Sequence, residues 1–213
     1  HTENQTMTTL WTAAGNPSDA LATARELTAD MILDASGLNW EVEKRQAMYR
    51  DNAGEMRAIK GQYAPVRSDN GRAFPATVGS VWEPYQNREL VQFALSLRAH
   101  GEVVPSKAGT FGTEQERTMI ELRIGRELIV RKGEPRGVVQ PFLTLYNAHD
   151  GSGSVSAHEV MRTLVCSNGA ISHTATGGFK VRHTKSTETR MQAGAELLRH
   201  FQAQARGFEQ TAQ

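Results

Sequence analysis

The pair His149–Asp150 is the feature of this sequence that most resembles a reactive site. An adjacent imidazole and carboxylate can bind a metal ion or share a proton, and with His183 they would supply the side chains of a metal-dependent nuclease. The spacing matches no familiar paired-ligand pattern such as H-x-x-x-H or C-x-x-C. Asp150-Gly151 is also typical of a hairpin turn. We therefore predict no metal site and no cofactor, and keep the nuclease as an alternative.

A second chemical possibility is a thiol nucleophile at Cys166, the single cysteine of the chain, with His158 or His183 as its base. Cys166 follows Leu164 and Val165, and a lone cysteine in an apolar run is more often a small buried hydrophobe. The glycines match neither the phosphate-binding loop nor the dinucleotide fingerprint. We therefore predict no catalytic residue.

The remaining constellation is a set of basic side chains on predicted strands and around the start of the last predicted helix. Arg117 and Arg123 have the same parity, so in a regular strand they share a face. Aromatic rings at Phe111, Tyr146 and Phe179 could stack on bases. We predict a nucleic-acid-binding surface made of Lys107, Arg117, Arg123, Arg126, Arg162, Lys180, Arg182, His183, Lys185 and Arg190.

A plainer interpretation of the same residues is a mixed charged sheet surface, because carboxylates are interleaved with the basic positions. These carboxylates are Glu114, Glu116, Glu121 and Glu127. The sequence alone does not choose between the two interpretations.

Composition limits the function classes further. The net charge of +1 over 213 residues excludes a strongly charged chain of the kind that binds nucleic acid or membranes through its overall charge. Residues 161–206, however, carry seven Lys/Arg against two Glu, which favours a local surface that binds anions. The single cysteine indicates a reducing compartment. No apolar run approaches the roughly twenty residues of a membrane span, and the N-terminus has no signal-peptide core. We expect a soluble protein of the cytoplasm.

The elements that must position these residues follow from hydrophobic periodicity and turn signals. Helices are predicted after Ser18 up to Gly37, after a cap at Asn87, and over 186–206. Strands are predicted over 38–45, 56–59, 63–67, 74–78, 118–124, 127–130, 138–146, 155–165 and 181–184. The strongest signal is the hairpin of Val138–Tyr146 with Val155–Val165.

This pattern predicts an α+β fold: a twisted, mostly antiparallel β-sheet with three or more α-helices. The strands between 38 and 78 form a β-meander, with Asn70-Gly71 at one of its turns. We assign residues 1–15 to an N-terminal tail and residues 16–213 to a single α+β domain.

Taken together, several segments resemble the phage/plasmid-like proteins catalogued as domain of unknown function 932. The segments are Gly37–Val42, Tyr85–Leu90 with Phe93, Gly109–Gly112, Pro141–Gly151, Val165–Asn168 and Val181–Thr184. The chain departs from the family at Trp11–Gly15, where the family tends to have a Trp-His-Gly-like opening.

The family has no established catalytic residues, so the resemblance assigns none to this chain. It implies that the protein is encoded by a phage, a plasmid or an integrated element. In that setting, a sheet decorated with helices resembles single-strand annealing proteins, which often form rings. We therefore expect a DNA-binding protein of a mobile element that acts in recombination or replication by single-strand annealing. Its expected partners are single-stranded DNA and further copies of itself, in a ring or filament. A module that binds a host protein, as in anti-defence, is the remaining alternative.

Overall fold

The computed structural model describes residues 6–9, 26–100, 103–125, 128–129, 138–164, 171–194 and 196. These residues form two antiparallel sheets. The main sheet has the order β1-β5-β6-β8-β9-β10, with β7 also pairing with β8, and the small sheet has the order β2-β3-β4. The main-sheet strands are β1 (Thr6–Thr9), β5 (Val103–Phe111), β6 (Arg117–Ile124), β7 (Leu128–Ile129), β8 (Val138–Ala148), β9 (Val155–Leu164) and β10 (Ile171–Val181).

The small sheet consists of β2 (Val42–Arg50), β3 (Met56–Arg67) and β4 (Val78–Gly79). The helical elements are α2 (Ala29–Ala35), α3 (Asn87–Ser96) and the 3-10 helix η1 (Leu97–His100), and residues 187–194 are also helical. The predicted α+β class with a mostly antiparallel sheet is therefore confirmed.

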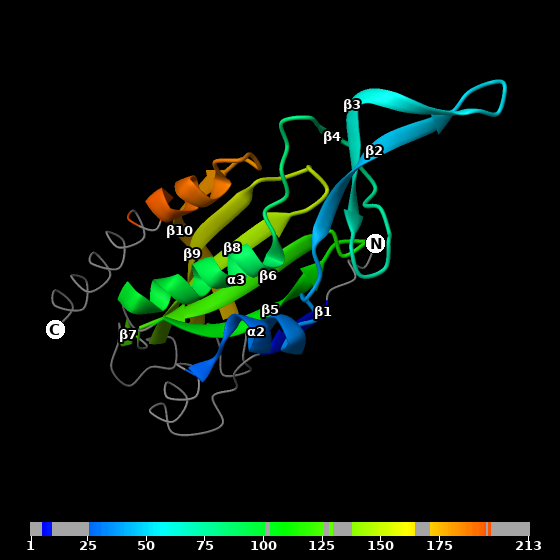
Figure 1. Ribbon diagram of the computed structural model, residues 1–213. Helices are drawn as coiled ribbons and strands as arrows, with labels where there is room; N and C mark the ends of the chain where they lie inside the picture. Colours follow the sequence, from blue (N-terminus) through cyan, green and yellow to red (C-terminus); the bar gives the residue numbers. More distant parts are fainter. Residues whose placement is uncertain are drawn as a thin grey trace.

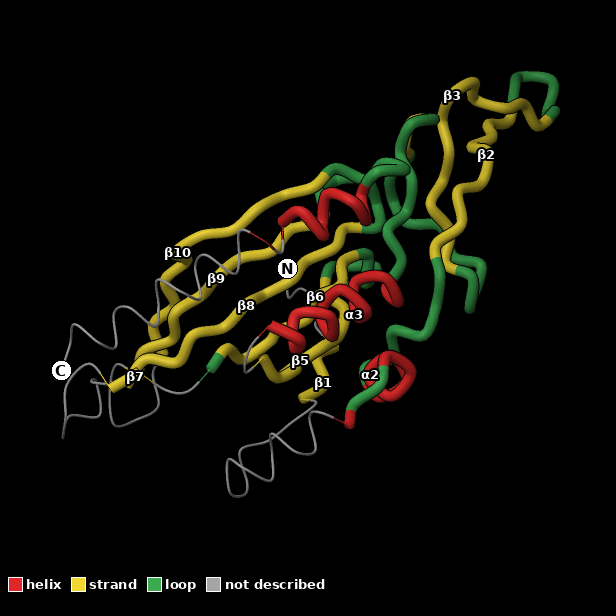
Figure 2. The backbone as a smooth tube through the Cα atoms, turned by 60° about the vertical axis from the view of Figure 1, so that its left-hand side comes forward, coloured by secondary structure: helices red, strands yellow, loops and turns green. Residues whose placement is uncertain are grey.

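The helices lie on one face of the main sheet (Figures 1 and 2). The hydrophobic core contains side chains of both the helices and the sheet. Leu122 and Leu145 point from the sheet into this core, where they meet Leu90 and Phe93 of α3 and Met191 of the last helical segment, all of them buried. We call the helix-covered side the inner face of the main sheet and the opposite side its outer face. Alternation along each strand then decides which side chains reach the outer face.

The N-cap of helix α3 lies one residue earlier in the sequence than predicted. Gln86, not Asn87, is the N-cap, and it forms a capping box in which the Glu89 carboxylate accepts from the Gln86 backbone N–H at 2.6 Å. Asn87 is the first helical residue and is buried. Its side chain is thus free for the contacts with other segments described below.

The predicted meander between 38 and 78 is confirmed in outline by β2, β3 and β4. The return strand β3 is much longer than predicted, and the register between Gln46 and Met48 shifts at a bulge that contains Gly61 with φ +75°. Gln46 holds the bulge, because its Nε2 donates to the carbonyls of Ile59 at 2.8 Å and Gln62 at 3.0 Å. The ribbon bends at this bulge and projects from the body (Figure 1). We call residues 46–61 the arm.

Two further expectations need correction. Residues Thr6–Thr9, assigned to a tail, form strand β1, which pairs with residues Lys107–Thr110 of β5. The predicted strand at 181–184 lies in fact at Ile171–Val181, and the chain turns after Val181. The predicted helix start at Ser18, the corner at Cys166 and the helix beyond residue 196 fall outside the described residues.

The predicted hairpin of β8 with β9 is confirmed. Its turn is stabilised by Asp150, whose Oδ1 accepts from the Ser152 N–H at 3.0 Å and from the Ser152 hydroxyl at 2.6 Å. Gly151 has φ +75°, and a Cβ atom there would lie 2.5 Å from Cγ1 of Val78. This hairpin turn is therefore packed directly against the β4 region.

None of the helices in the described part of the chain is long and apolar enough to cross a membrane.

Gly151→Ala is expected to lower the free energy of unfolding by about 2 kcal/mol or more, since it adds a steric clash to the cost of positive φ. Gly71→Ala is the matched control, because Gly71 has φ +69° with open space around it and should lose only about 1 kcal/mol. Urea unfolding measures both. The double variant Gly151→Ala with Val78→Ala should lose less free energy of unfolding than the sum of the two single losses, because Val78→Ala removes the clashing methyl group. Equal losses for Gly151→Ala and Gly71→Ala would contradict the packing of this turn.

Candidate nucleic-acid interface

Strand β6 shows how the sheet separates basic from apolar side chains. Thr118, Ile120 and Leu122 are buried on the inner face, so Arg117 and Arg123 lie on the outer face. The prediction that Arg117 and Arg123 share a face is thereby confirmed.

The register of the neighbouring strands brings three more predicted basic residues to this face. Lys107 of β5 lies opposite Glu121 of β6, Arg162 of β9 lies opposite Gln140 of β8, and Lys180 of β10 lies opposite Ser156 of β9. Directly opposed residues of an antiparallel pair point to the same side. The basic side chains so placed on the outer face are Lys107, Arg117, Arg123, Arg162 and Lys180.

Acidic side chains are nearly absent from the same surface. Among the described side chains of β5, β6, β8, β9 and β10, the outer face carries one carboxylate, that of Glu121. Glu159, the other carboxylate on these strands, has the parity of the inner face, because it lies opposite buried Leu143. The outer face therefore carries an excess of positive charge.

Aromatic rings run across the outer face between the basic groups. The rings of Phe111 and Tyr146 meet edge to face with centroids 5.9 Å apart, and Tyr146 meets His158 in the same way at 5.7 Å. The Arg117 guanidinium lies over the Phe111 ring at 5.9 Å. Phe179, also considered for stacking, packs against the core on the inner face instead.

One ion pair is built into this surface. The Glu121 side chain is only 1% exposed, and both of its carboxylate oxygens accept from the Arg162 guanidinium, whose side chain is 21% exposed. The same guanidinium lies 4.1 Å above the Phe142 ring. Arg162 therefore stabilises the buried Glu121 carboxylate. Of the other basic residues on this face, Lys180 is exposed and Lys107 and Arg117 are half-buried.

Two titratable rings described on the outer face, those of Tyr146 and His158, stay neutral near pH 7. Burial and the nearby Glu121 carboxylate raise the pKa of Tyr146. Burial and the neighbouring Lys180 lower the pKa of His158, whose Nε2 lies 3.0 Å from the Ser156 hydroxyl. Among the described side chains of this face, the positive charge therefore comes from lysine and arginine.

The other predicted binding residues lie elsewhere. Arg182, Lys185 and Arg190 are exposed, but they follow β10 and enter the helical segment that packs on the inner face. His183 is buried and stacks on Trp82 with centroids 5.4 Å apart, so we leave it out of the proposed interface. Arg126 lies outside the described residues.

The histidine that we considered for metal binding is instead part of a buried polar network. Asn87 Oδ1 lies 2.8 Å from the Thr118 hydroxyl and 2.9 Å from Nε2 of His149, and it accepts from both. This geometry places the neutral imidazole's proton on Nε2. Asn147, next in the network, donates from Nδ2 to the carbonyl of Tyr85 at 2.6 Å.

His149 and His183 are held neutral by their surroundings. Burial lowers the pKa of His149 to about 3, and the neighbouring His183 and Arg67 act in the same direction. Burial lowers the pKa of His183 to about 4, although the Asp150 carboxylate acts against the shift. Within the described residues no group of three His, Cys, Asp or Glu side chains is arranged to hold a metal ion. This network therefore supports the fold and gives the nuclease alternative no support.

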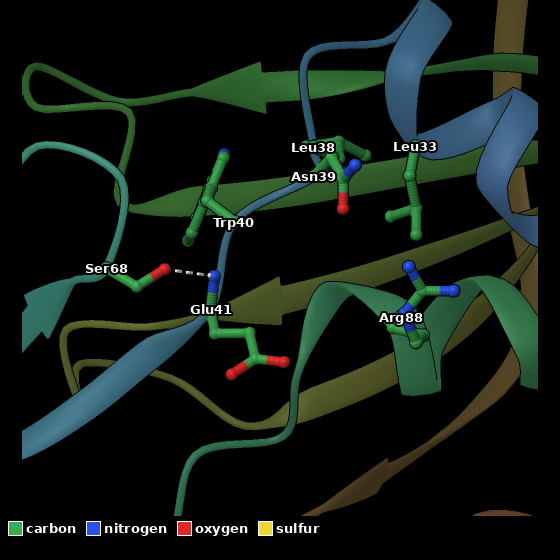
Figure 3. Close-up of a pocket in the computed structure, with 7 residues that line it drawn as sticks. All are labelled: Leu33, Leu38, Asn39, Trp40, Glu41, Ser68 and Arg88. Carbon is green, nitrogen blue, oxygen red and sulfur yellow. Dashed lines mark hydrogen bonds between the residues drawn. The ribbon is translucent and has the colours of Figure 1, made fainter.

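A small surface pocket of about 240 Å³ lies between α2, the start of β2 and α3 (Figure 3). Several of its polar groups already have partners, since the Ser68 hydroxyl accepts from the Glu41 N–H at 2.9 Å and Arg88 pairs with Asp30. Its volume is also below that of most ligand sites. The pocket was not predicted from the sequence, and its lining indicates no particular chemistry.

His183→Phe is expected to flatten the pH dependence of stability. The folded pKa of about 4 lies below the usual 6.5, so the unfolded chain binds the proton first and stability falls as the pH drops from about 6.5 towards 4. Between pH 7 and 4.5 the substitution should remove on the order of 2 kcal/mol of this loss. Phenylalanine keeps the stacking on Trp82. Urea unfolding across pH measures the effect, and an unchanged pH profile would contradict the buried neutral state.

Arg162→Met is expected to cost about 3 kcal/mol or more, because it leaves the Glu121 carboxylate buried without this guanidinium. Replacing both residues, Arg162→Met with Glu121→Leu, should recover much of the loss. The control is Arg45→Met, since the Arg45–Glu43 pair is about half exposed and should contribute less than about 1 kcal/mol. Equal losses for Arg162→Met and Arg45→Met in urea unfolding would refute the structural role of the buried pair.

Comparison with known proteins agrees with the resemblance seen in the sequence. The family model described as Domain of unknown function (DUF932) matches residues 76–213, which include α3, all of β5 to β10 and hence the outer face. Strands β2 and β3 precede the matched residues. No match was found among the curated proteins or the solved structures. Because the model covers 138 of the 213 residues, the chain belongs to the DUF932 family.

Proposed function

We propose that this protein binds single-stranded DNA along the outer face of its main sheet. The supporting observation is the separation of charge described above: five basic side chains and one carboxylate share a face with the rings of Phe111 and Tyr146. Basic groups attract the phosphate backbone, and aromatic rings offer stacking platforms that tolerate any sequence. A sheet face of this composition suits an extended single strand.

The biological setting is the further part of the proposal. The resemblance to phage and plasmid proteins supports a role in the recombination or replication of a mobile element inside a bacterial host cell. An antiparallel sheet with helices on one face is the architecture that suggested single-strand annealing, and an annealing protein would act as a homo-oligomer in a ring or filament. This step is an analogy between architectures.

The test is a titration of a fluorescent oligonucleotide at several salt concentrations. Lys107→Ala, Arg117→Ala and Lys180→Ala together remove three charges from the outer face while leaving the Arg162–Glu121 pair intact. Each single-strand phosphate contact contributes about 0.7 to the log–log salt slope, so the slope should flatten by about 2 and binding should weaken. The fold should persist, because these groups are outside the core.

The control is Arg182→Ala, Lys185→Ala and Arg190→Ala, which removes the same number of charges beside the helical segment. This control should keep most of the parent's affinity and salt slope. If the control loses binding and the outer-face variant keeps it, the binding surface lies on the helical side and the outer-face proposal fails. If the parent does not bind the oligonucleotide, the DNA-binding proposal itself fails.

A further inference from the structure

Three aromatic rings of the outer face form a connected row that crosses the strands. Phe111 lies on β5, Tyr146 on β8 and His158 on β9, and each side chain is partly exposed. The ring centroids are 5.9 Å apart for Phe111 and Tyr146, and 5.7 Å apart for Tyr146 and His158. We call these three residues the ring row. Its members are close enough to act together on one bound molecule.

Basic side chains flank the ring row. Arg117 lies directly opposite Phe111, and its guanidinium is 5.9 Å from the centre of that ring. Lys180 lies in line with Tyr146 across the sheet, because Ser156 pairs with both residues. A nucleic-acid strand whose bases lie on the rings therefore has basic groups beside its phosphates.

The rings of the row are turned steeply against one another. The planes of Phe111 and Tyr146 make an angle of 77°, and those of Tyr146 and His158 an angle of 67°. A base that stacks on an aromatic side chain lies parallel to its ring. Bases that stack on two neighbouring rings are therefore tilted against each other by similar angles, and they cannot stack on each other.

The spacing of the ring row leads to the same conclusion. Consecutive bases in one strand of a B-form duplex rise about 3.4 Å, whereas the ring centroids are 5.9 and 5.7 Å apart. The pairing of β8 with β9 and the 3.0 Å contact of His158 Nε2 with the Ser156 hydroxyl hold the rings in place. A strand that places one base on each ring is therefore stretched relative to a duplex strand.

We propose that the ring row binds consecutive unpaired bases and holds them apart, and that the outer face for this reason prefers pyrimidine-rich single strands. Pyrimidines lose the least when neighbouring bases are unstacked, because they stack weakly within a strand. Adenine runs resist the same geometry because they stack well. A duplex does not fit, since its bases are already paired and stacked. This inference rests on the proposed function, to which it adds the class of strand that the site takes.

The test compares oligo(dT) with oligo(dA) of equal length in the fluorescence titration at one salt concentration. The parent should bind oligo(dT) at least about fivefold more tightly. Tyr146→Leu keeps an apolar side chain at the centre of the row but removes the ring. It should weaken oligo(dT) binding about tenfold, the loss of one base stack, and bring the two affinities closer together. Tyr49→Ala is the matched control, because Tyr49 is 49% exposed on the arm, and it should change neither affinity.

A second measurement reports the unstacking directly and needs no variant. Two adjacent 2-aminopurines in a strand give an exciton-coupled circular dichroism signal while they are stacked, and this signal should be lost when the parent binds. Equal binding of oligo(dT) and oligo(dA), a retained exciton signal, or a folded Tyr146→Leu variant that binds like the parent would each overturn this inference and leave DNA binding standing. A parent that binds neither oligonucleotide would refute the proposed function as well.

Discussion

The side chain of Asn87 is the interaction on which the arrangement of the whole structure depends. Its Nδ2 donates to the carbonyl of Leu38 at 3.1 Å, while its Oδ1 accepts from Thr118 of β6 and from His149 at the end of β8. One buried amide thus joins the start of α3, the approach to the small sheet and two strands of the main sheet. A buried polar group that satisfies several segments at once specifies how they meet, because any other arrangement leaves it unpaired.

Local patterns predicted the two faces of strand β6 well. The alternation that places Arg117 and Arg123 on one face and Ile120 on the other depends only on neighbouring residues of the same strand. They failed where pairing with distant segments decides the outcome. Thr6–Thr9 has no apolar pattern of its own and is a strand because β5 lies beside it. Asn87 was predicted as a cap because asparagine often caps helices, yet its partners lie about thirty to sixty residues away.

The candidate interface shows the same division. Its basic residues are recognisable by type, but Lys107 and Lys180 are 73 positions apart, and only the strand order β5-β6-β8-β9-β10 brings them to one surface. Sequence proximity misled where the chain turns, as at His183, which lies next to exposed Arg182 and is itself buried. Strand β10 ends at Val181, so the alternation of a strand no longer describes which way Arg182 and His183 point.

The bulge in β3 has a consequence for how the arm is attached to the body. At this point the ladder between β2 and β3 is replaced by the side chain of Gln46, which reaches the carbonyls of Ile59 and Gln62. Gly61 supplies the positive φ that lets the strand change direction there. The two parts of the ribbon are therefore joined where strand pairing is interrupted, and one side-chain amide supplies hydrogen bonds in place of that pairing.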